Sequence, residues 1–587
     1  MIKMSRADRV LLLVVSLYLW AVAAAQPAPA VKQTAPPSSA ATQLLDITAR
    51  TGIHFSHMST PEARYIVESM SGGVALIDYD QDGYPDIYFT NASSVEMALR
   101  DKKARGALFH NNHDGTFTDV TDKAGVGYPC WAMGAAVGDY NNDGRPDLLV
   151  TCFGGIVLYR NNGDGTFTDV TKQAGLGGDS AWATGASFGD YDGDGWPDLF
   201  VAHYVDFHLD DLPTFGSKKT CQYHDVPVQC GPRGLKGTGD NLFHNRGDGT
   251  FEDVSKQAGV DDPHGFFGLT AVWTHLNGSG PPNLFVANDG EANFLYVNDG
   301  HGHFSDIAFP SGVAVNQDGT EQANMGVALG DYRHTGRFSI AISHFSEEYA
   351  TLFRNDGGLS FTDASYPSGI ARATTPYVGW GDAFIDLTNS GWQDFILVNG
   401  HVYPQVGASG IGTTYREPKL VYANQHNGSF RDVSQLSGSA VQVPQVSRGL
   451  AVGDLFNDGH LEIVIENLEG EPMILRADAD PQNHWISLEL HGTKGNLLAL
   501  NAVAKVIAGD LVQTDEVRSG GSYLSQNDLR LHFGLGKHAR ADKAQVTWPS
   551  GTKETLTNLA ADRFYVIQEG KGIVSSHPAA KPPSFAR

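Results

Sequence analysis

Short acidic loops recur along this chain, and each lies between a run rich in Gly and Ala and a second, more apolar run. The first three loops span residues 78–86, 139–147 and 190–198. Each carries carboxylate or amide side chains at alternate positions, followed by a glycine that lets the backbone turn back sharply. Oxygens spaced in this way can converge on one Ca²⁺ ion, which takes about six to eight oxygen ligands. The loops therefore predict calcium sites, and their repetition predicts a repeat architecture.

The runs that flank the loops have the features of β-strands. They are short and rich in β-branched and aromatic residues, as in 87–90 and 148–151. A tight Asp-Gly or related turn then joins two further strands, for example within 108–120. Acidic loops start at 78, 139, 190, 275, 331, 386 and 454, and four strands per repeat predict an all-β fold, a seven-bladed β-propeller over residues 43–479. An open solenoid of calcium-binding turns is the alternative, but its repeats would be shorter and more regular.

The two ends of the repeat region predict how the ring closes. Only six of the paired hairpin strands follow the seven acidic loops, yet the N-terminal segment 45–52 copies the sequence 117–125 that ends the first hairpin. We therefore expect this N-terminal strand to complete the last blade. Closure would remove a sheet edge that is otherwise open to aggregation.

The pattern changes near residue 480. Segments such as 485–490 and 502–507 alternate apolar and polar residues and are joined by Gly-rich turns, which predicts a separate small β domain over residues 480–570. The linker 26–42 and the tail 571–587 are rich in Pro, Ala and Ser, and we expect both to be disordered.

The N-terminus and the cysteines indicate an exported protein. Residues 1–25 combine basic residues, an apolar run and a small-residue end, which is the pattern of a secretory signal peptide. A retained membrane anchor is the alternative, although a span needs about 20 apolar residues and this run is shorter. An even number of cysteines in an exported chain predicts two disulfides, Cys221–Cys230 within one loop and Cys130–Cys152 across the second acidic loop. The chain would then be secreted, extracellular or periplasmic, with no membrane span after signal cleavage.

The charge of the chain argues against one class of partner. Its formal net charge is −25 at pH 7. Nucleic acid binding needs clustered Lys and Arg to neutralise phosphates, so nucleic acid is excluded as a partner. Bound metal would neutralise part of the acidic charge instead. We expect a monomer.

The motifs resemble a known family. The Asp-Xaa-Asp-Xaa-Asp-Gly-Xaa-Xaa-Asp loops and the Asn-Xaa-Gly-Asp-Gly-Thr-Phe hairpins resemble the FG-GAP (VCBS) repeats of integrin-type propellers. The run 516–536, followed by 546–551, resembles the ASPIC/UnbV domain. Together they resemble the cartilage acidic protein family and its bacterial relatives, from about residue 45 to residue 569. The resemblance implies a secreted, calcium-binding protein that acts in adhesion or ligand binding, and it implies no settled activity.

The candidate calcium ligands are the oxygen-bearing side chains of five loops. The first three loops keep the full motif, whereas the sixth and seventh keep part of it. The fourth loop has no carboxylate and the fifth has Arg333 at a ligand position, so we expect no ion in either. The predicted ligands are Asp78, Asp80, Asp82, Asp86, Asp139, Asn141, Asp143, Asp147, Asp190, Asp192, Asp194, Asp198, Asp386, Asp394, Asp454, Asp458 and Glu462.

Three functions fit these features. The first is a non-enzymatic, calcium-stabilised propeller that binds a protein or glycan ligand. We favour it because the sequence has no Gly-Xaa-Ser-Xaa-Gly motif, no His-Glu-Xaa-Xaa-His motif and no phosphate-binding loop with a Lys. The second is a polysaccharide lyase or hydrolase, because paired carboxylates could be hidden among the many Asp residues. The third is a structural or assembly factor that acts through the C-terminal domain.

The longest irregular loops predict where a ligand would bind. Loops 203–240 and 401–419 connect second and third strands, so they lie on the face opposite the acidic loops. Both carry aromatic residues of an exposed type, namely Tyr204, Phe207, Tyr223, Tyr403 and Tyr415. Long loops on a rigid scaffold often carry binding function, so we expect either a docking face here or lids that pack over the central channel.

Overall fold

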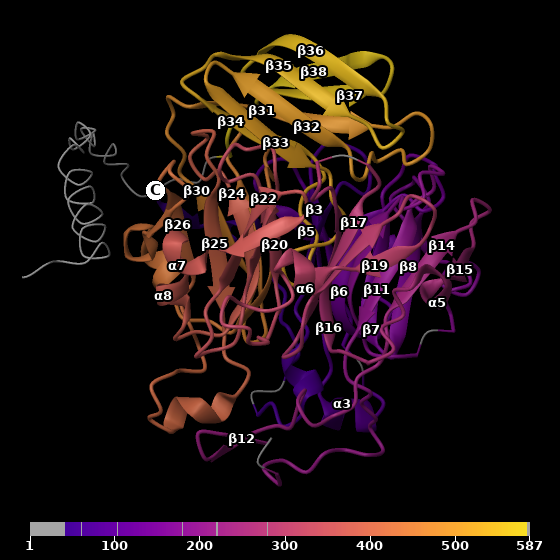
Figure 1. The fold of residues 1–587 in the computed structure, drawn as a ribbon, viewed down its shortest axis with the longest axis vertical. Coiled ribbons are helices and arrows are strands. Elements are labelled where there is room, and N and C mark those ends of the chain that lie inside the picture. The colour runs from indigo at the N-terminus through magenta and orange to yellow at the C-terminus, as the bar shows by residue number, and fades with distance from the viewer. Residues whose placement is uncertain are drawn as a thin grey trace, which may run out of the picture. The chain divides into compact units, whose positions relative to one another are not determined.

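Seven four-stranded antiparallel sheets account for most of the chain between Leu44 and Ala477. The computed structural model describes residues 42–59, 62–102, 104–178, 180–218, 221–278 and 280–583. The predicted signal peptide 1–25 and nearly all of the linker 26–42 lie outside these residues. The sheets follow one another in sequence, which makes this an all-β propeller (Figure 1).

The strands of the first six sheets are consecutive in the chain except for one insertion. The first three sheets are β2 (Val74–Ile77), β3 (Asp86–Phe89), β4 (Ala107–Asn111) and β5 (Phe117–Asp119); β6 (Trp131–Gly138), β7 (Asp147–Phe153), β8 (Gly155–Asn161) and β9 (Phe167–Asp169); and β10 (Ala183–Gly189), β11 (Asp198–His203), β14 (Asn241–Asn245) and β15 (Phe251–Asp253). The next three are β16 (Gly268–Thr274), β17 (Asn283–Asn288), β18 (Phe294–Asn298) and β19 (Phe304–Asp306); β20 (Val327–Gly330), β21 (Ser339–Ile342), β22 (Thr351–Gly357) and β23 (Ser360–Asp363); and β24 (Gly379–Ile385), β25 (Asp394–Asn399), β26 (Leu420–Asn424) and β27 (Phe430–Asp432).

The N-terminal strand completes the last of these sheets. It has the order β1-β30-β29-β28, in which β1 (Leu44–Asp46) pairs antiparallel with β30 (Met473–Ala477), followed by β29 (Glu462–Asn467) and β28 (Ser447–Gly453). The backbone N–H of Gly449 donates to the carbonyl of Gly72 at 2.9 Å, which joins the last sheet to the first. The expectation that the N-terminal strand closes the ring is therefore confirmed.

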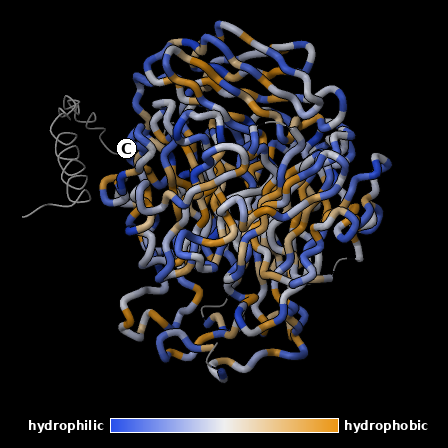
Figure 2. Tube along the Cα trace, viewed as in Figure 1, coloured by the Kyte–Doolittle hydropathy of each residue, from blue (hydrophilic) through white to orange (hydrophobic). Residues whose placement is uncertain are grey.

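We call the strand that enters the acidic loop the inner strand of its sheet, and inner strands of neighbouring sheets contact one another, as β6 contacts β10, β10 contacts β16 and β24 contacts β28. Small residues allow this approach: a Cβ on Gly326 would lie 2.1 Å from the carbonyl oxygen of Trp380 on the next inner strand. Apolar residues gather along the strands, whereas hydrophilic residues gather in the loops (Figure 2). Burial of these strand side chains between sheets supplies the hydrophobic stabilisation.

The helices of the described residues are short and lie in the connections between strands. Single turns follow the outermost strands, and most of them end at a glycine in the left-handed conformation, as Gly125 does at φ +77°. These turns are α2 (Thr48–Thr51), α4 (Thr121–Ala124), α5 (Ser255–Ala258), α6 (Ala308–Ser311) and α7 (Ser365–Ser368). The remaining helices and the short inserted strands are α3 (Val95–Leu99), α8 (Ala371–Thr374), α9 (Ser439–Gln442), η1 (Ile66–Ser69), η3 (Pro404–Ala408), η4 (Ser434–Leu436), β12 (Gln222–Tyr223) and β13 (Val226–Pro227). None of the helices in the described residues has the length and apolar character needed to span a bilayer.

The C-terminal domain contains two further four-stranded sheets. One has the order β34-β31-β37-β38 and the other β33-β32-β35-β36. Their strands are β31 (His484–His491), β32 (Val503–Ala508), β33 (Leu511–Glu516), β34 (Leu531–Gly536), β35 (Arg540–Thr547), β36 (Lys553–Ala560), β37 (Arg563–Gln568) and β38 (Gly572–Pro578).

The last strand corrects one expectation. We expected residues 571–587 to be disordered, but β38 (Gly572–Pro578) pairs antiparallel with β37 (Arg563–Gln568). Its side chains are mostly exposed, because β38 is an edge strand that is held by backbone hydrogen bonds rather than by an apolar face. Composition alone suggested a disordered tail because the signal for such a strand is weak.

Both predicted disulfides are present. Cys130 is bonded to Cys152 and Cys221 to Cys230. The first joins the residue before β6 to β7, whose strands pair on either side of the second acidic loop. The second lies in the long insertion between β11 and β14.

Candidate metal centres

The first acidic loop brings its carboxylates together. Donor oxygens of Asp78, Asp80 and Asp82 all lie within 4.8 Å of one another. The backbone N–H groups of Asp82 and Gly83 donate to Asp78 at 3.1 and 2.9 Å, so the loop folds around that carboxylate. Gly83 has φ +89°, a conformation that favours glycine. This is the convergence that the alternate spacing predicted.

The third loop repeats this arrangement. Donor oxygens of Asp190, Asp192 and Asp194 also lie within 4.8 Å of one another. Gly193 and Gly195 donate to Asp190 at 2.9 and 3.0 Å. Two sequence-distant loops therefore form the same carboxylate cluster.

The fourth predicted ligand of each cluster is deeply buried. Asp86 and Asp198 are 1% and 0% exposed, at the start of β3 and β11. Asp86 accepts a hydrogen bond from Asn111 N–H at 2.8 Å, and Asp198 accepts one from Asn245 N–H at 2.8 Å. These bonds fix each carboxylate at the base of its cluster.

Each cluster also includes a histidine that the sequence analysis missed. His110 Nδ1 lies 3.2 Å from Asp86 and 3.4 Å from Asp80, and the ligand atoms of the three residues lie within 4.8 Å of one another. His244 has the same place in the third loop, 3.0 Å from Asp198 and 3.5 Å from Asp192.

The electrostatics of these loops favour a bound cation. Burial and the charge of nearby carboxylates raise the pKa of Asp78 and of Asp190 to about 7. A hydrogen bond with Asp86 raises the pKa of His110, and one with Asp198 raises the pKa of His244 to about 9. Each cluster thus has an excess of negative charge that a positive group stabilises. Oxygen-rich donor sets of this kind suit hard cations such as Ca²⁺, so the residues fit the predicted ion.

The second loop differs from these two. Asp139 accepts from Asp143 N–H and Gly144 N–H at 3.0 and 2.8 Å, as in the first loop. However, the Arg145 guanidinium contacts the Asp143 carboxylate, and Asn141 Nδ2 donates to it at 2.9 Å. The Asn141 Oδ1 atom is buried without a hydrogen-bond partner, and Asp147 lies buried at the base of the loop. The predicted ligands are thus together, but a cation from the loop itself already contacts one of them.

In the sixth loop the first carboxylate is hydrogen-bonded by the loop itself and the second by the third strand of its sheet. Asp386 accepts from the backbone N–H groups of Ser390 and Gly391 at 3.0 and 2.6 Å, and from the Thr388 and Ser390 hydroxyls. Asp394 accepts from Asn424 N–H at 2.9 Å. Hydroxyls therefore take the places that carboxylates have in the first loop.

In the seventh loop an internal cation takes the place expected for an ion. Arg476 Nη1 lies 2.5 Å from Glu462, and its Nη2 lies 2.7 Å from Asp458. The Arg476 side chain is 9% exposed, and both carboxylate side chains are fully buried. Asp454 accepts from Asp458 N–H and Gly459 N–H, as the first residue of the loop does elsewhere. Two of the three predicted ligands of this loop are therefore paired with Arg476, whose single positive charge offsets one of their two negative charges.

The fourth and fifth loops use other partners. His275 Nδ1 lies 2.7 Å from Glu516, a buried residue of the C-terminal domain, so a carboxylate reaches this loop from β33. In the fifth loop Asp331 accepts from Thr335 N–H and Gly336 N–H at 2.7 and 2.8 Å. Ser279 of the fourth loop lies outside the described residues.

One strand position distinguishes these loops. Each of His110, His244 and Arg476 lies on the third strand, opposite the last ligand of its loop. Arg476 is paired with Glu462, and His110 and His244 directly follow the residues paired with Ile87 and Leu199. Arg160, Val297, Arg354 and Ala423 have the same position in the other sheets, directly before a buried Asn. The sequence contained this signal in the Leu-Phe-His-Asn copies, but only the sheet register shows that it faces the acidic loop.

The long loops on the opposite face act mainly as lids. Tyr204 and Phe207 are 0% and 7% exposed, and Tyr223, Tyr403 and Tyr415 are half-buried. Tyr223 packs against Tyr403, whose ring centroid is 5.7 Å away, so the two loops meet. The expectation of exposed aromatics is wrong for Tyr204 and Phe207, because burial of their apolar surface over the channel end is more favourable.

A groove remains on this face beside the first disulfide. It has a volume of about 630 Å³ and is lined by the β7–β8 hairpin at Cys152–Val157, by Leu209 of the long insertion, and by residues that precede β6 and follow β9. Tyr128, at its edge, is 51% exposed. Asp169, Lys172 and Gln173 add polar groups to the wall.

Comparisons with known proteins agree with the repeat pattern and the C-terminal motif. The model of the FG-GAP-like repeat matches residues 78–150 and 139–201, and that of ASPIC and UnbV matches residues 492–574. Cartilage acidic protein 1 of Mus musculus is 24% identical over 522 residues, covering 85% of this chain and 73% of that protein. Its Homo sapiens counterpart is 25% identical over 339 residues, covering 55% of this chain and 47% of that protein.

Solved structures with similar folds are more distant. An Agrocybe aegerita lectin that recognises non-reducing terminal N-acetylglucosamine gives a TM-score of 0.36 at 17% identity, covering 63% of this chain and 81% of the lectin. The BP39L lectin of Burkholderia pseudomallei gives 0.38 at 10% identity, covering 69% and 98%. Neither likeness is close enough to indicate a ligand. The chain carries FG-GAP-like repeats and a C-terminal ASPIC and UnbV domain, and it is homologous to cartilage acidic protein 1.

Proposed function

We propose that this chain is an exported, calcium-binding β-propeller that recognises a protein or glycan partner and has no enzymatic activity. The observation that carries the calcium proposal is the pair of carboxylate clusters in the first and third loops, whose donor oxygens lie within 4.8 Å of one another. The FG-GAP-like repeats and the similarity to cartilage acidic protein 1 support a role in adhesion or ligand binding. The two disulfides support export to an oxidising compartment.

Calcium would be held mainly by side chains of the loops themselves. Asp78, Asp80 and Asp82 would bind one ion, and Asp190, Asp192 and Asp194 another, with Asp86 and Asp198 at the bases. The ions would neutralise the clustered charge and hold the loops in one conformation. Affinities typical of extracellular modules, about 10⁻⁴–10⁻³ M, mean that millimolar calcium adds about 1 kcal/mol per site.

The groove beside Cys130–Cys152 supports a ligand-binding role. It combines an exposed aromatic side chain, Tyr128, with polar groups, and a rigid sheet lies beneath it. Aromatic rings with adjacent polar groups can bind either the apolar face of a sugar ring or a protein side chain. Its place on the face of the long loops agrees with the predicted docking face.

Calcium binding can be tested with a matched pair of variants. Asp190→Asn should remove one bound ion in equilibrium dialysis against Ca²⁺, because it removes a cluster carboxylate. Asp331→Asn is the control: Asp331 also accepts from two backbone N–H groups of its own loop, and the described fifth loop has no such cluster. We expect at least two ions in the natural protein. Failure to detect any bound ion, with the same melting temperature in Ca²⁺ and EDTA, would refute the proposal.

The absence of enzymatic activity and the binding role need a separate experiment. The labelled protein is applied to a glycan array and to immobilised extracellular matrix protein. Polysaccharides that contain the glycans of the array are also incubated with the protein and assayed for new reducing ends and unsaturated products. The proposal is supported if the natural protein binds a glycan or matrix protein without releasing product, and if Tyr128→Ala reduces the amount of bound protein at least tenfold. Product formation at a rate above that of heat-inactivated protein would instead establish the enzyme alternative.

A further inference from the structure

A cavity lies between the first acidic loop and the C-terminal domain. It has a volume of about 310 Å³, which is within the range of pockets that bind small molecules. Much of its lining is apolar and consists of Leu76, Val137, Leu490, Leu498, Leu529 and Val566. Gln81 and His577 also line the cavity, and because both are exposed, the cavity opens to solvent beside them.

The C-terminal domain covers the turn glycine of most acidic loops but leaves that of the first loop uncovered. A Cβ added to the turn glycine of the second, third, fifth, sixth or seventh loop would lie within 4 Å of this domain. In the sixth loop, for example, a Cβ on Gly391 would lie 2.6 Å from Leu511. A Cβ on Gly83 would have no described atom within 4 Å, and Gly83 lines the cavity. The side chains of the C-terminal domain therefore leave the space beside the first loop open.

The charged groups of the lining are mainly acidic. Four carboxylates and one guanidinium line the cavity, those of Asp78, Asp82, Glu489, Asp528 and Arg530. The excess of carboxylates makes the electrostatic potential of the cavity negative. A cationic ligand is therefore favoured over an anionic one.

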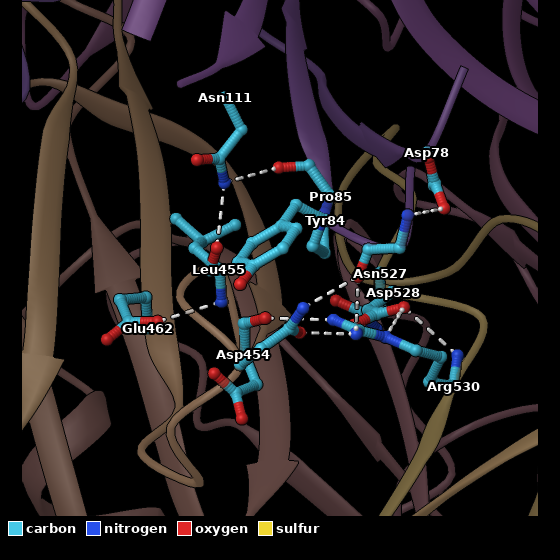
Figure 3. A network of polar contacts seen from close by, with 12 residues as sticks. Asp78, Tyr84, Pro85, Asn111, Asp454, Leu455, Glu462, Asn527, Asp528 and Arg530 are labelled. Carbon is cyan, nitrogen blue, oxygen red and sulfur yellow. Dashed lines mark hydrogen bonds and ion pairs between the residues drawn. The ribbon is translucent and has the colours of Figure 1, made fainter. Parts of the chain in front are cut away.

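The guanidinium of Arg530 is not available to an anion, because its N–H groups already have acceptors (Figure 3). Its Nε and Nη2 donate to Asp528 at 2.9 and 2.7 Å. Its Nη2 also donates to the Asp454 carbonyl at 2.8 Å, and its Nη1 donates to the Gly83 carbonyl and to Asn457 Oδ1 at 3.2 and 2.6 Å. Arg530 thus holds the wall of the cavity in place.

Glu489 is the carboxylate that is best placed to pair with a cationic ligand. Its Oε1 lies 2.6 Å from His491 Nε2, and its other oxygen has no hydrogen-bond partner among the described residues. The side chain is 40% exposed, so a ligand in the cavity can reach it. Although burial favours the neutral acid, the hydrogen bond with His491 and the nearby positive charges lower the pKa of Glu489. This carboxylate is therefore ionised at neutral pH.

We propose that the cavity binds an organic ammonium ion, a small molecule that carries a protonated amine on an apolar body. The ammonium group donates to Glu489, and the apolar body contacts Leu490, Leu529 and Val566. Such a ligand matches both the acidic and the apolar parts of the lining. The site is separate from the groove beside Cys130–Cys152, and it depends neither on that groove nor on bound calcium.

The test compares ligands that differ in charge. The full-length protein is titrated calorimetrically in EDTA with 2-phenylethylamine, with hexylamine, and with 2-phenylethanol, which has the same apolar body as the first amine but no charge. We expect 2-phenylethylamine to bind about tenfold more tightly than the alcohol, because a hydrogen bond between two ions is stronger than one to a neutral group. EDTA keeps calcium from the loops, so the result does not depend on the proposed calcium sites. The proposal is overturned if neither amine binds at millimolar concentration or if the alcohol binds as tightly as the amine.

A matched pair of variants identifies the carboxylate that recognises the amine. Glu489→Gln keeps the size of the side chain but removes its charge, and it should weaken binding of 2-phenylethylamine about tenfold. Asp562→Asn is the control and should leave the affinity unchanged: Asp562 is 45% exposed and pairs with His484 at 2.8 Å, but it does not line the cavity. Melting temperatures show whether both variants fold.

Hydrogen exchange locates the bound amine. We expect 2-phenylethylamine to slow exchange in residues 489–491 and 528–530, which line the cavity. An unchanged affinity in Glu489→Gln, an equal loss in Asp562→Asn, or protection confined to other segments would show that the amine binds elsewhere, against the proposal.

Discussion

The turn glycines of the first and third acidic loops provide a matched test of how the propeller supports the C-terminal domain. Gly83 and Gly195 have the same place in their loops and nearly the same φ, +89° and +90°. A Cβ on Gly83 would have no atom within 4 Å. A Cβ on Gly195 would lie 2.7 Å from the carbonyl oxygen of Lys494 and 3.3 Å from Cα of Gly495, both in the C-terminal domain.

The expected costs differ because of this contact. An alanine in the left-handed region costs about 1–2 kcal/mol at either position. Gly195→Ala must also displace the backbone of the C-terminal domain, which adds about 1–3 kcal/mol. The Gly195 carbonyl accepts from Asn496 N–H at 2.6 Å, so the displacement would also strain this hydrogen bond. We therefore expect Gly195→Ala to be less stable than Gly83→Ala by about 1–3 kcal/mol.

Two measurements check this prediction. Denaturant unfolding in millimolar Ca²⁺ compares the free energies of unfolding of the two variants. Hydrogen exchange over residues 492–500 should be faster in Gly195→Ala and unchanged in Gly83→Ala. Equal destabilisation, or a larger loss in Gly83→Ala, would contradict the contact between this loop and the C-terminal domain.

Three further predictions follow from the buried charges. Arg476→Met removes the guanidinium from Glu462 and leaves Asp458 with His460 as its remaining partner. The loss should cost about 3–5 kcal/mol in EDTA. Added Ca²⁺ should restore part of this stability, and thermal melts in both buffers test the prediction. Burial and neighbouring carboxylates raise the pKa of Asp78 and Asp190 to about 7 from an ordinary value of 3.8, so between these values the folded, metal-free protein binds more protons than the unfolded chain. Its stability in EDTA should therefore fall as pH rises from about 5 to 8. The stabilisation by Ca²⁺ should grow over the same range, because the ion needs ionised carboxylates. Melting temperatures that do not change with pH would contradict this prediction. Asp382→Val should raise the melting temperature, because both carboxylate oxygens of Asp382 are buried without a hydrogen-bond partner among the described residues. A valine fits this position, since β20 has Val327 at the corresponding place in its sheet. A lower melting temperature would show that Asp382 has a partner that the structure does not contain.

Much of the propeller could be predicted because its signals are local. The loop 78–86 contains its own ligands, its turn glycine and the ends of both flanking strands, so the sequence of one repeat suffices. The pairing of β1 with β30 was also predictable, because the segment 45–52 copies a strand whose role was already known from the other repeats. Periodicity and turn chemistry carry this kind of information.

The parts that could not be predicted depend on distant segments. His110 and Arg476 reach the acidic loops from the third strand, so their role appears only when the sheet register is known. Glu516 reaches the fourth loop from another domain, 241 residues away in sequence from His275. Residues 519–528 hydrogen-bond to the inner strands of the propeller, and contacts with so many separate strands leave no periodic pattern within the segment itself.

The strand position occupied by His110, His244 and Arg476 suggests how such repeats can change their dependence on the surroundings. In the last sheet the polypeptide itself supplies a cation at this position, because Arg476 pairs with Asp458 and Glu462. An arginine there is not sufficient by itself, since Arg354 has the same position in the fifth sheet and pairs with Asp356 instead. A chelator-resistant scaffold would therefore need both the guanidinium group and the surroundings that direct it toward the carboxylates.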